Sequence, residues 1–270
     1  MNENGSGLSR SLGLFKLTIY GVGTIVGSGI YSVIGPATQA AGLNIWLSFV
    51  FAAVASMFSA FSYAELASAF PSAGGEYNFL NQAFPKKRVI GFLVGLFIAI
   101  HSSATLATVA LTFALYLNQF LKFDSKLIAL ILIVALTLTN IIGLKRASWI
   151  NVGFTILQIL GLLTLIVAGF NDSFFSFIEK TVSVPFDIAK VLGGTSIIFF
   201  IYTGYEHLAS MSEEVKDPDK NIWKAFVLAL AISTIVYLGV IFSVLNLLGI
   251  DQLGASTEPL AEAADKKLRF

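Results

Sequence analysis

The chain has 270 residues, of which 56% are hydrophobic and 12% are charged, and its mean hydropathy is +0.82. Soluble domains carry about 25% charged residues, so this composition predicts a membrane protein and argues against a soluble enzyme or a soluble binding module. A net charge of +1 gives no reason to expect a nucleic-acid partner. The chain has no cysteine and only two histidines, so we expect no metal site and no cofactor.

Seven stretches predict helices that cross a lipid bilayer, because such a helix needs about 20 mostly apolar residues. We therefore expect an all-α transmembrane fold. The third stretch is too long to stand upright in a bilayer and is expected to be tilted. In chain order the stretches cover 12–34, 45–66, 89–120, 127–143, 149–169, 191–211 and 223–248.

Two connecting segments have a character of their own. The segment 70–85 lies between two prolines, and its aromatic and apolar residues predict a short amphipathic helix at the inner membrane interface. The segment 171–187 is moderately polar. It is interpreted as a connector, with a cap over the outer end of the helices as the alternative.

Lysine and arginine in the connecting segments set the expected orientation, because cytoplasmic loops carry an excess of these residues. With a cytoplasmic N-terminus, ten of the 17 basic residues lie on the cytoplasmic side, including the run Lys86 to Arg88 and the pair Lys145 and Arg146. We therefore predict a multi-pass protein of the cell membrane whose N-terminus faces the cytoplasm.

Glycines interrupt two of the predicted spans. The first span contains GVGTIVGSGIYSVIG at 21–35, and each interior glycine costs about 1 kcal/mol of helix propensity relative to alanine. We predict that this helix opens at Gly27 to Gly29, although small residues that let helices pack closely are an alternative explanation. The sixth span has a similar interruption at Ile201 to Gly204.

Two such breaks have a chemical use. The N–H groups at the start of a half-helix suit a carboxylate, and the carbonyl groups at the end of another suit an ammonium group. Two facing breaks are therefore able to hold an amino acid by its charged backbone. The two breaks are five helices apart, which is the separation that an inverted repeat requires, and paired broken helices mark binding sites in transporters.

Other polar or aromatic residues in the spans leave two interpretations open. Glu206 is either a functional ionisable group or a carboxylate solvated near the inner interface. Phe200 is either a gate over bound substrate or a packing residue. His101, Ser102 and Ser103 form a polar cluster in the third span.

Four segments resemble the amino acid–polyamine–organocation permeases, and the match is colinear over essentially the whole chain. These segments are GVGTIVGSGIYSVIGPATQAAG, SYAELASAFPSAGGEYNFLNQAFP, FFIYTGYEHLASMSEEVKDPDKNIWKA and SVLNLLGIDQLGASTEPLAEAA. The resemblance implies a leucine-transporter-like fold of two inverted five-helix repeats, at about 12–169 and about 190–270. Members of the family usually have twelve helices, so seven are expected here and the second repeat is incomplete.

The resemblance also implies alternating-access transport of amino acids or related amines. It places a carboxylate site at the first break, an amine site at the carbonyl groups of the second, and a polar contact at Ser103. Gln158 falls where several members have a lysine, which weakens simple proton symport and leaves exchange with a counter-substrate, facilitation or another proton relay open. Gln158, Phe200 and Glu206 are the coupling or gating candidates. The implied substrate-binding residues are Gly27, Ser28, Gly29, Ile30, Ser103, Phe200, Ile201, Tyr202, Thr203 and Gly204.

Two sets of alternatives remain at this point. The missing helices suggest a fragment of a longer product, a chain that meets a second chain, or a nonfunctional piece of a permease. Helix number alone would also permit a seven-helix receptor or photoreceptor. Such proteins place the N-terminus outside, against the basic-residue bias, and a retinal protein needs a lysine in the last helix, where 225–248 has none.

Overall fold

A computed structural model describes residues 10, 12–71, 74–142, 144–171 and 173–268. These residues form helices joined by short turns and contain no strand, which confirms the predicted all-α class. The α-helices are α1 (Leu14–Ile25), α2 (Gly29–Ala41), α3 (Ile45–Ala69), α4 (Gly75–Ala83), α5 (Arg88–Leu121), α6 (Ser125–Ile142), α7 (Leu144–Gly169), α8 (Phe174–Val182), α9 (Ile188–Tyr202), α10 (Glu206–Ser210), α11 (Pro218–Leu248), α12 (Ile250–Ala255) and α13 (Pro259–Leu268). Two 3-10 helices, η1 (Gly42–Asn44) and η2 (Ser212–Glu214), complete the set.

Most of the described residues in each of the seven predicted spans lie in a helix or a pair of helices, residue 143 at the end of the fourth span lies outside the described residues, and the predicted short helix in 70–85 is α4. Four stretches of the described chain are long and apolar enough to cross a membrane by themselves: Gly29–Ala69, Arg88–Asn118, Ile188–Ser210 and Pro218–Leu248. The bent pair Gly153–Gly169 and Phe174–Val182 raises this number to five. Two further apolar helices, Leu14–Ile25 and Ser125–Thr139, are shorter. Leu14–Ile25 is short because the first predicted span is divided after Ile25.

The helices divide into two compact units. The first unit contains the described residues of Met1–Ile25, Ala53–His101 and Tyr202–Ser233. The second contains the described residues of Val26–Ala52, Ser102–Ile201 and Thr234–Phe270. Several long helices therefore contribute one part to each unit, and the boundaries of the units fall at or beside both predicted breaks.

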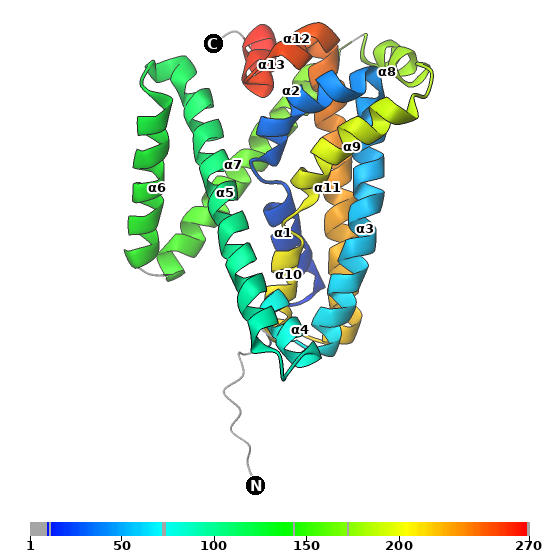
Figure 1. Ribbon diagram of the computed structural model, residues 1–270. Helices are drawn as coiled ribbons and strands as arrows, with labels where there is room; N and C mark the ends of the chain where they lie inside the picture. The colour runs from blue at the N-terminus through cyan, green and yellow to red at the C-terminus, as the bar shows by residue number, and fades with distance from the viewer. Residues whose placement is uncertain (1–9, 11, 72–73, 143, 172, 269–270) are drawn as a thin grey trace. The chain divides into compact units, whose positions relative to one another are not determined.

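In the first unit, α1 lies beside α10 (Figure 1). A Cβ atom added to Gly21 would lie 2.8 Å from the Ala229 Cβ and 2.9 Å from a methyl carbon of Leu208, so glycine is what permits this close contact. The chain before α1 is tied to the segment after η2, because the Leu12 N–H donates to the Glu214 carbonyl at 2.9 Å. These contacts hold α1 and the second break in one packed group.

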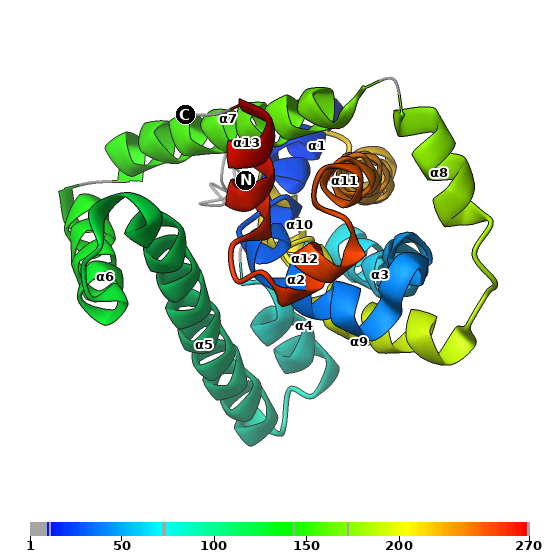
Figure 2. The same cartoon turned by 90° about the horizontal axis from the view of Figure 1, so that it is seen from above.

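In the second unit, α12 and α13 lie against α2, and α13 also contacts α7 (Figure 2). Gly35 lets α2 approach the backbone at the C-terminal end of α12. A Cβ atom added to Gly35 would lie 2.8 Å from the carbonyl oxygen of Ser256, the C-cap residue of α12. The start of α9 is joined to α3 by the buried Ser48, whose hydroxyl donates to the Val191 carbonyl at 2.9 Å. The beginning of α2 and the end of α9 thus belong to one well-packed body.

Candidate functional site

The first break separates α1 from α2 at Val26–Ser28, one residue before the predicted Gly27 to Gly29, so Gly29 is the first residue of α2. Ser28 is the N-cap residue of α2, and its side chain makes no capping hydrogen bond. The first N–H groups of a helix have no acceptor within the helix. The N–H groups of Gly29 and Ile30 are therefore directed away from the body of α2, with the positive end of its dipole behind them.

The second break separates α9 from α10 at Thr203–Tyr205. Gly204 lies at its centre with a φ of 115°, a conformation that L side chains rarely adopt. The prediction placed this break at Ile201 to Gly204, whereas the structure continues α9 through Tyr202. The difference is small, but it makes Ile201 and Tyr202 part of a helix end that carries outward-directed carbonyl groups.

Gly29 brings the start of α2 into direct contact with the end of α9. A Cβ atom on Gly29 would lie 2.7 Å from the Cγ2 of Ile201 and 3.2 Å from its Cα. A substitution here would therefore press on the side chain and on the backbone of α9. Both residues belong to the second unit, and their contact places the N–H end of one half-helix beside the carbonyl end of another.

Gln158 of α7 binds the backbone of the first break. Its Nε2 donates a hydrogen bond of 2.8 Å to the carbonyl oxygen of Gly27. A helix break in a membrane frees backbone groups that need partners, and the amide supplies one of them. Gln158, which the sequence comparison named as a coupling or gating candidate, thus makes a hydrogen bond to the backbone of the break.

Tyr237 of α11 has the corresponding position at the end of α9. Its hydroxyl donates to the Ile201 carbonyl oxygen at 3.2 Å, and its side chain is fully buried and packs against Phe49 with ring centroids 5.9 Å apart and the planes tilted by 50°. A carbonyl oxygen has two lone pairs, so Ile201 keeps one acceptor position beside this bond. No pattern in the sequence pointed to Tyr237, because its partner is 36 residues away.

In the first unit, Gly204 packs on the end of α1. An added Cβ would lie 2.5 Å from the carbonyl oxygen of Thr24, so only glycine fits. The Gly204 N–H donates to Oε2 of Glu206 at 2.7 Å. Glu206 is half-buried and binds the backbone of the break, a role that neither sequence interpretation had considered.

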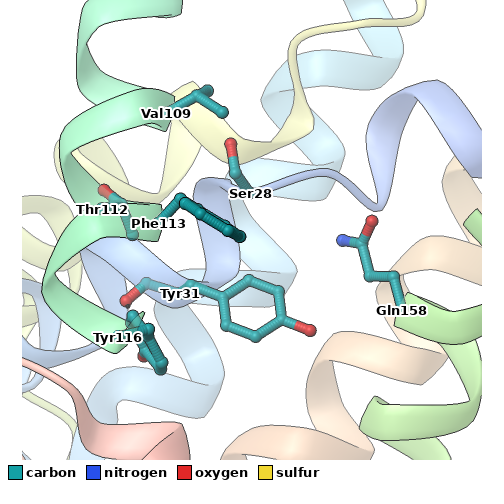
Figure 3. A pocket seen from close by; sticks show the side chains of 7 residues that line it. All are labelled: Ser28, Tyr31, Val109, Thr112, Phe113, Tyr116 and Gln158. Carbon is teal, nitrogen blue, oxygen red and sulfur yellow. Dashed lines mark hydrogen bonds between the residues drawn. The ribbon is translucent and has the colours of Figure 1, made fainter. Parts of the chain in front are cut away.

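A cavity of about 260 Å³ opens at the start of α2 within the second unit. Figure 3 shows the side chains that line it, from the start of α2, from α5 and from α7, with the Tyr31 ring in the middle of the view. The Tyr116 hydroxyl is bound to the Tyr31 carbonyl at 3.1 Å, and the two rings meet edge to face. The lining residues are Ser28, Tyr31, Val109, Thr112, Phe113, Tyr116 and Gln158.

Two of the lining residues, Ser28 and Gln158, were named from the sequence. Of the other candidates, Ser103 is exposed and Phe200 is half-buried, and neither lines this cavity. The α5 contribution begins six residues beyond Ser103, at Val109. Sequence reasoning missed the α5 residues, although the spacing 109, 112, 113 and 116 is that of one helical face.

Acidic and histidine side chains do not gather into a metal-binding group of three or more anywhere in the described residues. The chemistry that this region offers comes from backbone N–H and carbonyl groups, hydroxyl groups, an amide and aromatic rings. Such groups bind a polar or zwitterionic ligand through hydrogen bonds and helix dipoles.

Comparison with known proteins gives one family and several relatives. A family described as amino acid permease matches residues 12–268. An uncharacterized transporter of Mycobacterium tuberculosis is 30% identical over 259 residues, which are 95% of this chain and 57% of the relative. An inner membrane transport protein of Escherichia coli is 29% identical, with 91% of this chain and 58% of the relative covered.

A branched-chain amino acid permease of Bacillus subtilis is 28% identical over 254 residues, which cover 86% of this chain and 54% of the relative. The chain therefore spans about half the length of the curated relatives that it matches. The match runs through both breaks and through every residue that lines the cavity.

Proposed function

The chain belongs to the amino acid permease family, and on that basis we propose that it serves in the secondary active transport of amino acids, or related amines, across the cell membrane. Permeases are transporters and not enzymes, and membership of this family also displaces the seven-helix receptor as an explanation of the spans. The observation that carries the proposal is the contact of Gly29 with Ile201, which joins two half-helix ends of opposite polarity beside a cavity.

The substrate carboxylate binds at the beginning of α2 in this proposal. The N–H groups of Gly29 and Ile30 and the Ser28 hydroxyl are its donors. Support comes from the uncapped start of α2, from the helix dipole, which favours an anion at this end, and from the position of Ser28 in the cavity lining.

The substrate amine binds at the end of α9 in this proposal, where the acceptors are the carbonyl groups of Phe200 and Ile201. The contact between Gly29 and Ile201 supports a separation short enough for one amino acid. Tyr237 supports this assignment too, because its hydrogen bond fixes the direction of the Ile201 carbonyl while leaving one lone pair for an ammonium group.

Transport proceeds by alternating access in this proposal, with the two breaks as the points at which half-helices change direction. The breaks belong to the first helices of two inverted repeats, at about 12–169 and about 190–270. The basic-residue bias supports a cytoplasmic N-terminus. A tag at the N-terminus should then be accessible only after the cell membrane is permeabilised, and labelling of intact cells would reject this orientation.

The binding site is tested with Gly29→Val in the purified protein, reconstituted into liposomes and supplied with labelled amino acids. We expect binding and uptake to be lost, because the added carbons press on the backbone of Ile201. Gly161→Val is the matched control, since a Cβ at Gly161 has no atom within 4 Å. Uptake by Gly29→Val with unchanged apparent affinity would overturn the site assignment.

A further inference from the structure

The short helix α8 (Phe174–Val182) joins the apolar helix α7 to α9. We propose that α8 is an interfacial helix, which lies in the plane of the membrane at the boundary between lipid and water and inserts Phe175 and Val182 among the lipid chains. The partner of this surface is the lipid bilayer itself. An interfacial helix is neither the plain connector nor the cap that the sequence suggested for 171–187, and its position does not depend on the proposed transport function.

The direction of α8 follows from its angle to α7. The helical parts Gly153–Gly169 and Phe174–Val182 are bent by 92°, and Figure 2 shows α8 turning aside from the end of α7. Helices that cross a membrane are tilted by about 20° on average from the bilayer normal. With α7 as a membrane-crossing helix, as its apolar sequence predicts, α8 therefore lies close to the membrane plane at the depth where α7 ends.

Hydrogen bonds before and after α8 hold it in this direction. The Asn246 side chain of α11 donates to the Gly169 carbonyl at 3.0 Å and to the Asn171 side chain at 3.1 Å. The Asn44 side chain of η1 donates to the Pro185 carbonyl at 3.4 Å, and α8 itself packs against η1. The bend is thus fixed by the packing of the second unit.

Three strips of side chains run along α8, because residues seven positions apart lie on the same face of a helix. Phe174 and Thr181 are buried against the protein, with 4% and 2% of their surface exposed. Phe175 and Val182 form the next strip, and they are 73% and 46% exposed although both are apolar. The third strip is polar and exposed, and it contains Ser176, Glu179 and Lys180. One side of α8 therefore faces protein, one suits an apolar medium and one suits water.

The apolar strip of α8 continues an exposed apolar strip of α7. Along the second half of α7 and the residue after it, large apolar side chains are exposed every three or four positions. These residues are Leu160, Leu163, Val167 and Phe170. The Phe170 ring lies 4.1 Å from the ring centroid of the buried Phe174 and 6.1 Å from that of the exposed Phe175. The exposed surface of an apolar membrane helix thus passes without interruption into the exposed strip of α8.

Lipid fits this strip better than a protein partner does. A helix packs on protein through an apolar stripe at least about 100° wide. Phe175 and Val182 form only a single line of residues, with the polar strip directly beside it. Phenylalanine on the apolar side and lysine on the polar side, as in Phe175 and Lys180, are also typical of helices that lie in the interface plane.

The test uses the fact that the chain contains no cysteine, so a spin label attaches at one chosen position. Phe175→Cys and Val182→Cys are labelled with a nitroxide in the purified protein in liposomes, and power-saturation EPR measures collisions with oxygen and with a water-soluble nickel complex. Oxygen concentrates in lipid and the nickel complex in water. The ratio of oxygen to nickel collisions should therefore be several-fold higher for both variants than for Ser176→Cys, the matched control on the polar strip.

Two results would overturn the proposal. Nickel collisions as frequent in Phe175→Cys and Val182→Cys as in Ser176→Cys would place the apolar strip in water. Few collisions with either reagent would show that protein covers the strip. Because two positions report on the same strip, a variant that misfolds does not remove the test. The measurement involves no amino acid, so its result is independent of whether the proposed transport function holds.

Discussion

Replacement of Gly204 by alanine should destabilise the protein through two effects that the structure separates. The backbone φ of 115° is unfavourable for any residue with a Cβ, at about 1–2 kcal/mol. The added Cβ would also lie 2.5 Å from the Thr24 carbonyl oxygen and 3.0 Å from its carbon. These are backbone atoms that cannot rotate away, so overpacking adds about 1–3 kcal/mol. The expected total is about 2–5 kcal/mol.

The assay is thermal unfolding in detergent, followed by the fluorescence of the three tryptophans. With a shift of about 2–4 °C per kcal/mol, Gly204→Ala should lower the midpoint by at least about 4 °C. Gly161→Ala is the matched control: a Cβ there meets no atom within 4 Å, and alanine is the better helix former by about 1 kcal/mol. Its midpoint should stay the same or rise. A midpoint of Gly204→Ala within about 2 °C of the unchanged protein would refute this reasoning.

Two further substitutions test single hydrogen bonds. Gln158→Leu removes the donor to the Gly27 carbonyl, which should lower the free energy of unfolding by about 1–3 kcal/mol. It should also weaken amino acid binding about tenfold in an equilibrium binding assay. Unchanged affinity would show that Gln158 does not hold the break. Tyr63→Phe removes the bond of 3.1 Å from its hydroxyl to Glu76 of α4 while keeping the ring, at a cost of about 0.5–1.5 kcal/mol. Glu76→Met removes the acceptor and keeps a side chain of similar length. Equal losses of the midpoint in Tyr63→Phe and Glu76→Met would agree with one shared bond, and no loss in either variant would contradict it.

Much of the architecture follows from patterns that are local in the sequence. Apolar runs of about 20 residues predict helices wherever they occur, and glycine-rich interruptions such as Gly27 to Gly29 mark where a helix opens, because backbone propensity depends on neighbouring residues. Both breaks and the short helix α4 were therefore predictable from the sequence. The family was also predictable, because each of its motifs is a continuous stretch of sequence.

The long helix α5 shows where this reasoning ends. It is apolar on most sides, so its sequence does not distinguish a cavity-facing residue from one that faces lipid. The sequence prediction selected Ser103 as the polar contact, whereas the cavity lining begins at Val109 and includes Thr112 and Tyr116. Only the packing of α5 against the start of α2 decides which face is inside.

By itself, the sequence determined the membrane class, the helices, the two breaks and the family, all of which depend on residues close together in the chain. The tertiary structure alone decided the distant partners of the breaks: Ile201 against Gly29, Gln158 on the Gly27 carbonyl, and Tyr237 on the Ile201 carbonyl. The physical reason is that a freed backbone group takes whichever donor or acceptor the packing brings within about 3 Å. For the first break, that partner comes from a helix more than a hundred residues away.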